Sequence, residues 1–126
     1  MAFRLEIEKT ESLPYVLVDE EKEYLKLAGI CYHERAIDFF EQICTWLENF
    51  LKTDFNEFTF DFAMEYFNSS TAKLVFNMLL ALDNSAKEGK KIVINWMTTK
   101  DNEVIIEFGE DFQEELSNVE FNLIIR

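Results

Sequence analysis

Residues 58–66 constrain the fold more than any other part of the chain, because they alternate strictly between two kinds of side chain. Large apolar side chains stand at every second position and polar or small ones between them: Phe58, Phe60, Phe62, Met64 and Tyr66 against Thr59, Asp61, Ala63 and Glu65. A period of two is typical of a β-strand with one buried face. A strand buried between two helix layers would be apolar throughout. The pattern therefore predicts a sheet with one face partly exposed to solvent.

The other hydrophobic patterns predict further elements in a definite order. Strands are expected at 3–7 (half-buried), 14–18, 24–27, 92–97 and 121–125, with a charged turn at 19–22 and a connection at 29–33. Apolar spacings of three and four predict helices over 34–51, from 68–71 to the stop signal at Gly89, and over 104–116. This order predicts one α/β domain over residues 1–126, with a mixed sheet and about three helices.

The charge balance limits the classes of partner. The chain has 25 acidic residues against 12 Lys and Arg, for a formal net charge of −13. Nucleic acids and anionic membrane surfaces are bound by clustered basic side chains, so the balance argues against both. The first ten residues lack the apolar core of a signal peptide, and no apolar run is long enough to span a membrane. We expect a cytoplasmic protein in which Cys31 and Cys44 are reduced.

Catalysis and metal binding find little support in the residue patterns. His33 is the only histidine, and there is no glycine-rich phosphate loop or Gly-flanked nucleophilic serine. Asp61 and Glu65 share a strand face, and five acids lie within 107–115, but solvated surfaces explain both in so acidic a chain. We therefore predict no catalytic residue, no metal and no cofactor. A small ligand- or metal-binding enzyme that uses Asp61, Glu65 and the acidic helix stays open as an alternative.

The strand-to-helix junction at 65–73 has two interpretations. Asn68, Ser69, Ser70 and Thr71 are residues that cap helix N-termini, and capping alone would explain them. In that case the protein could be a constitutive scaffold subunit in which Ser69 is only a cap. The second interpretation is a phosphorylation switch, because the free amides and the dipole at a helix N-terminus accommodate an added phosphate.

Apolar side chains outside the main helix faces are candidates for contact with a partner. Ala72, Phe76 and Leu80 form a second stripe on the helix that follows the junction. Phe39 and Trp46 lie seven residues apart at the margin of the polar face of the 34–51 helix. For Phe39 and Trp46, packing at the flank of the core is the commoner role.

Several blocks of the sequence together resemble the SiaC family of bacterial regulatory phosphoproteins. The segment 66–73 (YFNSSTAK) is similar to the family signature, and four further blocks follow the family order: 29–51 with its Ala-x-x-Phe-Phe and Trp-Leu-Glu runs, Asn95-Trp96, 107–112 and 121–124. These blocks span nearly the whole chain. The family looks like the anti-sigma factor antagonist (STAS) domains, so the resemblance implies a single STAS-like domain.

The resemblance implies a protein without catalytic activity that switches partners. A serine/threonine kinase would phosphorylate it, a PP2C-type phosphatase would reverse the modification, and the unphosphorylated form would activate a diguanylate cyclase, raising cyclic-di-GMP and favouring biofilm. The phosphoacceptor of the family follows the Asn, which makes it Ser69 here, with Ser70 and Thr71 as fallbacks. The expected partner-binding residues are Asn68, Ser70, Ala72, Lys73, Phe76, Leu80 and Phe39.

Two stretches depart from the family pattern. Residues 32–35 (YHER) stand where the family commonly has a proline and then Glu-Asn, and Met97-Thr98 stand where aromatic residues are usual. Neither stretch includes the expected phosphoacceptor, Ser69. The departures leave the identity of the partner open.

Overall fold

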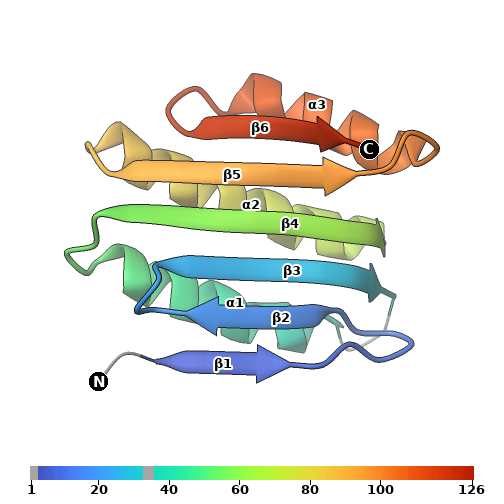
Figure 1. Cartoon of the computed structure of the whole chain (residues 1–126), viewed down its shortest axis with the longest axis horizontal. Coiled ribbons are helices and arrows are strands. Elements are labelled where there is room, and N and C mark those ends of the chain that lie inside the picture. Colours follow the sequence, from blue (N-terminus) through green and yellow to red (C-terminus); the bar gives the residue numbers. More distant parts are fainter. Residues whose placement is uncertain (1–2, 33–35) are drawn as a thin grey trace.

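The computed structural model of the chain describes residues 3–32 and 36–126. Its elements follow the predicted order: β1 (Arg4–Ile7), β2 (Tyr15–Asp19), β3 (Tyr24–Cys31), α1 (Ala36–Leu51), β4 (Glu57–Phe67), α2 (Ser69–Lys87), β5 (Lys91–Thr98), α3 (Glu103–Glu115) and β6 (Glu120–Ile125) (Figure 1). The predicted helix over 104–116 is confirmed as α3. The predicted start of the first helix, at residue 34, lies outside the described residues.

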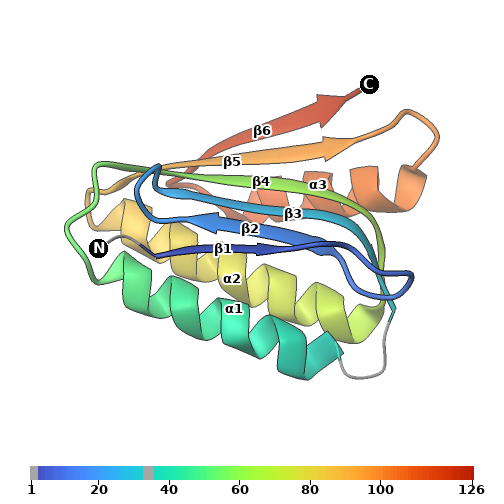
Figure 2. The same cartoon turned by 60° about the horizontal axis from the view of Figure 1, so that its bottom comes forward.

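The six strands form one mixed sheet in sequence order, β1-β2-β3-β4-β5-β6. The first three are antiparallel neighbours, and β3 to β6 run parallel to one another. Helices connect the parallel strands, and all three helices cover the same face (Figure 2). The opposite face, which we call the open face, is turned toward the viewer in Figure 1. The prediction of a mixed α/β fold with one partly exposed sheet face is confirmed.

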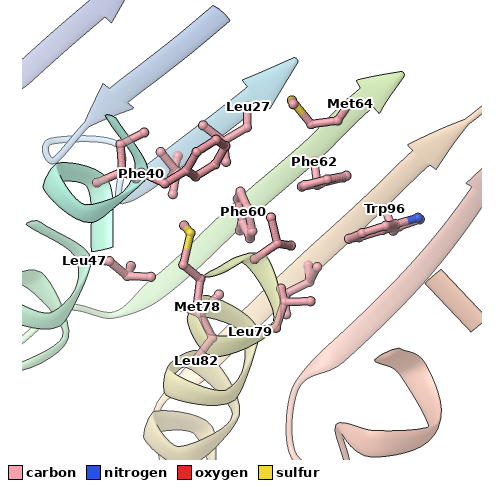
Figure 3. Close-up of a cluster of buried hydrophobic side chains, with 14 of the residues drawn as sticks. Leu27, Phe40, Leu47, Phe60, Phe62, Met64, Met78, Leu79, Leu82 and Trp96 are labelled. Atoms are coloured by element: carbon pink, nitrogen blue, oxygen red, sulfur yellow. The ribbon is translucent and has the colours of Figure 1, made fainter. Parts of the chain in front are cut away.

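The core lies between the sheet and the helices. Phe58, Phe60 and Phe62 of β4 are fully buried there, as their alternation predicts. Leu79 and Leu82 of α2 pack against the strands from below (Figure 3). Burying each such side chain contributes roughly 1.5–3 kcal/mol, so this layer provides most of the apolar driving force.

Two boundary predictions need correction at the N-terminal half of the sheet. The connection expected from Gly29 is wrong, because β3 continues through Cys31 by pairing with β4. The expected half-buried strand at 3–7 exists as β1, but Phe3 and Leu5 are exposed. The reason is that β1 is an edge strand, with a neighbour on one side only.

A β-bulge near the end of β4 changes which side chains are exposed. Gly29 pairs with Met64, but the next residue of β3, Ile30, pairs with Tyr66. Glu65 is therefore an extra residue in β4, and the alternation reverses after it. Phe67 is buried, whereas Tyr66, which the alternation groups with the buried phenylalanines, is 48% exposed.

Candidate functional site

The carboxyl ends of the parallel strands and the starts of the three helices meet at one edge of the sheet. The strands β3, β4 and β5 end there, and α1, α2 and α3 begin there (Figure 1). The carboxyl ends of parallel strands are where open α/β sheets generally bind their ligands. We call this edge the carboxyl edge.

At the carboxyl edge, α2 begins with two exposed serines. Asn68 is the N-cap: its Oδ1 accepts a hydrogen bond from the Thr71 amide at 2.9 Å, and its carbonyl oxygen accepts one from the Ala72 amide at 2.9 Å. Within the described part of the chain, the amides of Ser69 and Ser70 make no comparable bond. Two outward amides at the positive end of a 19-residue helix favour an anion at this point.

The three hydroxyls of the junction differ in access. Ser69 and Ser70 are exposed, whereas Thr71 is fully buried and its Oγ1 lies 3.8 Å from the Cys31 sulfur. A kinase acting on the folded protein could therefore reach Ser69 and Ser70 but not Thr71. The interpretation of Ser69 as the helix cap is wrong, because Asn68 performs that role.

Exposed apolar side chains lie at the edge of the sheet where α2 begins. Among the described residues, four large ones are exposed where β3 and β4 end and where α1 and α3 begin: Tyr32 by 52%, Ile37 by 44%, Tyr66 by 48% and Val104 by 59%. Tyr32 and Tyr66 pack edge to face, with ring centroids 6.3 Å apart. Asn102, the N-cap of α3, joins α3 to this edge by donating from Nδ2 to the carbonyl of Glu65 at 2.9 Å. We call these four residues the apolar rim.

Sequence reasoning missed the apolar rim as a group. The alternation groups Tyr66 with the buried residues, because a bulge leaves no mark in an alternating pattern. The spacings of three and four place Ile37 on the apolar face of the first helix and Val104 at the start of the apolar stripe of the last. Exposed side chains at helix starts and strand ends become neighbours only when the parallel strands align, so no local pattern reports them.

The predicted apolar stripe on α2 is largely engaged within the molecule. Ala72, Phe76 and Leu80 are half-buried against the core, and the Phe76 ring stacks on Phe112 of α3 at 5.3 Å. Lys73 is exposed. Packing against α3 therefore explains the second stripe, and a role in partner contact stays a prediction.

The two aromatic side chains suspected on α1 also have intramolecular contacts. Phe39 is half-buried and packs edge to face on Phe40 at 5.5 Å. Trp46 stacks on Phe50 at 5.2 Å and donates from Nε1 to Glu20 at 2.8 Å. Both side chains flank the core, which was the commoner role expected of them.

The carboxylates of the alternative enzyme hypothesis are not brought together for catalysis. Asp61 accepts hydrogen bonds from the Tyr24 hydroxyl at 2.5 Å and from Asn95 at 2.8 Å on the open face. Glu65 is exposed at the carboxyl edge. The acids of α3 point to solvent, and the described residues contain no group of three His, Cys, Asp or Glu able to hold a metal ion.

The two thiols do not form a disulfide. Cys31 is buried, and Cys44 is half-buried in α1. Burial, together with Glu48 and Glu41 nearby, raises the pKa of the Cys44 thiol to about 11. The Cys44 thiol is therefore a poor nucleophile near neutral pH. In the described part of the chain, no helix combines the length and apolar character needed to cross a membrane.

Comparison with known proteins links this fold to solved structures. SiaC of Pseudomonas aeruginosa superimposes with a TM-score of 0.90 at 25% identity, covering 98% of this chain and 99% of that one. A chain in the crystal structure of the diguanylate cyclase SiaD in complex with its activator SiaC, from the same organism, gives a TM-score of 0.90 at 27% identity, with 97% and 99% covered. These likenesses confirm the α/β fold, while the STAS-like label stays a prediction.

Sequence comparison gives the same relationship. An uncharacterized protein of Pseudomonas aeruginosa strain UCBPP-PA14 is 28% identical over 113 residues, which are 90% of each chain. The model of the SiaC family of regulatory phosphoproteins matches residues 7–126. The chain therefore belongs to the SiaC family of regulatory phosphoproteins.

Proposed function

We propose that this protein is a non-catalytic, cytoplasmic partner-switching regulator, controlled by phosphorylation of Ser69. Unphosphorylated, it binds and activates a diguanylate cyclase or a similar effector, which raises cyclic-di-GMP and favours biofilm formation. A serine/threonine kinase adds the phosphate, and a PP2C-type phosphatase removes it. Membership of the family and the SiaD complex support the class of partner.

The observation that carries the proposal is the exposure of Ser69 at the carboxyl edge, three residues after Tyr66 of the apolar rim. Ser69 is exposed beside Tyr66 and is not needed as a cap, so its hydroxyl is available for modification. Tyrosine side chains that are partly exposed and packed on one another are typical anchors of protein interfaces. The rim therefore supports partner binding, and the serine lies where that binding can be regulated.

Phosphorylation would act on this surface by desolvation and repulsion. A phosphate carries a charge of roughly −1.5 to −2 at neutral pH, and the protein already has a net charge of −13. The amides of Ser69 and Ser70 would hold the phosphate close to the rim. An effector that covers the rim would then have to bury a dianion, which is costly unless it supplies a basic side chain.

The binding test compares five forms of the full chain against the effector cyclase by calorimetry: wild type, enzymatically phosphorylated protein, Ser69→Ala, Ser69→Glu and Ser70→Glu. We expect phosphorylation and Ser69→Glu to weaken binding by at least about tenfold, because a buried unpaired charge costs more than roughly 1–3 kcal/mol. Ser69→Ala should bind like wild type. Equal affinity of all five forms would refute the switch, and a loss at Ser70→Glu alone would move the phosphoacceptor to Ser70.

A second pair of variants tests the rim itself. Tyr66→Ala should weaken binding of the unphosphorylated protein by about tenfold or more, as truncation of an interface tyrosine commonly does. The matched control is Tyr15→Ala, which removes a tyrosine of β2 on the open face. If both variants bind the cyclase equally well, the apolar rim is not the contact surface.

A further inference from the structure

The open face of the sheet has a hollow that the proposed switch does not use. It has a volume of about 710 Å³ and lies over the carboxyl ends of β3, β4 and β5. Its floor is formed where Ala28 pairs with Ala63 on the neighbouring strand and where Gly29 follows. Because these three neighbouring residues have a methyl group or no side chain, they leave the sheet surface uncovered. The hollow therefore results from the small size of these side chains. Ser69, at the start of a helix on the other face, does not line it.

Basic side chains from three distant segments line this hollow. Lys9 comes from the β1–β2 connection, Lys26 from β3, and Arg126 follows β6. Within the described chain, no carboxylate lies within 4 Å of any of these three charges. Cations that share one concavity repel one another, and a bound anion would relieve this repulsion.

The acidic side chains nearby offset this charge only in part. Asp61 is in register with Lys26 and keeps its negative charge while its oxygens accept hydrogen bonds from Tyr24 and Asn95, but it is not part of the lining. Asp101 lines the hollow and accepts a hydrogen bond from the Thr99 hydroxyl at 2.7 Å. Glu65 is the other carboxylate in the lining, which leaves three cations against two acids. The rest of the surface is strongly acidic, so this hollow is where an anion would concentrate.

We propose that the hollow binds a small phosphate-bearing molecule of nucleotide size. Arginine presents a planar fork that matches phosphate oxygens, and lysines add point charges. Ala28, Ala63 and Met97 provide an apolar floor for the non-phosphate part of the ligand. The volume lies within the range of about 300–1,000 Å³ that is usual for small-molecule sites. Ser69 does not line the hollow, whereas Glu65 and Asn102 of the carboxyl edge do.

The probes are pyrophosphate, GTP and the uncharged nucleoside guanosine, each titrated into the isotope-labelled full chain at millimolar concentration. We expect pyrophosphate and GTP to shift the amide resonances of Ala28 and Ala63 and guanosine alone to leave them unchanged. If GTP binds more tightly than pyrophosphate, the base and sugar contact the apolar floor. If the two bind equally tightly, the hollow recognises the phosphates alone. No shift with either phosphate, or shifts confined to the N-terminus of α2, would overturn the proposal.

Charge variants make the test specific. Lys26→Gln and Arg126→Gln should each weaken phosphate binding by about tenfold, as expected for loss of one charge-assisted contact. Lys52→Gln, an exposed lysine after α1, removes the same charge elsewhere and should bind like wild type. Lys9→Gln, in an exposed connection, is the replacement if Lys26→Gln fails to fold. Equal loss in the Lys52 control would show general charge attraction and refute the site.

Discussion

The two faces of the sheet are made by alternate residues of the same strands and are stabilised by different forces. Trp96 on the helix-covered face is fully buried and stacks on Phe62 with ring centroids 3.9 Å apart. Its neighbour Asn95, on the open face, donates to Asp61 at 2.8 Å and accepts from Asn122 at 3.0 Å. Burial of apolar surface thus supports one face, and hydrogen bonds between polar side chains support the other.

The polar bonds on the open face form a ladder across four strands. Tyr24 of β3, Asp61 of β4, Asn95 of β5 and Asn122 of β6 are linked in that order. An uncovered apolar sheet face would be an aggregation hazard. The open face instead carries polar side chains, and the ladder satisfies their hydrogen-bonding groups without a second helix layer. An exposed sheet face can thus be ordered by hydrogen bonds between side chains and still contain a hollow.

The largest effect should come from truncating the aromatic stack. Trp96→Ala should lower the free energy of unfolding by about 3–5 kcal/mol, because it leaves a cavity between the sheet, Phe62 and Phe112. It also leaves the Ile105 carbonyl without the indole donor that it has at 2.9 Å. Denaturant unfolding measures the change. Asn95→Ala, the adjacent residue, should cost only about 1–2 kcal/mol, and equal losses would contradict the distinction between the faces.

A smaller effect tests how tightly α3 packs on the same stack. A Cβ at Gly109 would lie 2.5 Å from Cδ1 of Trp96 and 3.0 Å from Leu123. Gly109→Ala should therefore destabilise the protein by about 1–2 kcal/mol, because overpacking outweighs the gain of about 1 kcal/mol in helix propensity. Thermal unfolding of Gly109→Ala beside Glu110→Ala, its exposed neighbour, checks this. A stabilised Gly109→Ala would mean that α3 can move away from the sheet.

The smallest expected effect is a change in the free energy of unfolding at alkaline pH, and it depends on Tyr24 of the open face. Burial first, and then the hydrogen bond to Asp61, raise the pKa of Tyr24 above its ordinary value. A raised native pKa stabilises the fold below the unfolded tyrosine value of about 10, and this stabilisation is lost as the pH rises above it. The difference in unfolding free energy between wild type and Tyr24→Phe should therefore shrink between about pH 8 and pH 11. A constant difference would show that Tyr24 titrates normally.

Much of the fold could be predicted from local patterns. The period of two at 58–64 and the spacings of three and four in α1 are set by the geometry of strands and helices, which is local. The stop at Gly89 is local too, since its φ of +106° suits a residue without a side chain. The position of Ser69 at the start of α2 followed from the same reasoning and from the family resemblance.

The surroundings of the candidate site could not be predicted in this way. The bulge at Glu65 depends on the register between β3 and β4, and it is the bulge that exposes Tyr66 beside Ser69. The burial of Thr71 depends on its position over Cys31, 40 residues away in the chain. Such distances are decided by packing, which a single strand or helix pattern does not encode.

By itself, the sequence determined the kind and order of the elements, the mixed sheet with one wet face, and a serine at a strand-to-helix junction, because all of these follow from side-chain periodicity and capping chemistry. Only the tertiary structure decided which serines are accessible, which apolar side chains are exposed at the same edge, and that Lys9, Lys26 and Arg126 line one hollow with Ala28 and Ala63. The physical reason is that periodicity is a property of neighbours along the chain, whereas a surface is composed of residues that strand alignment brings together from distant segments.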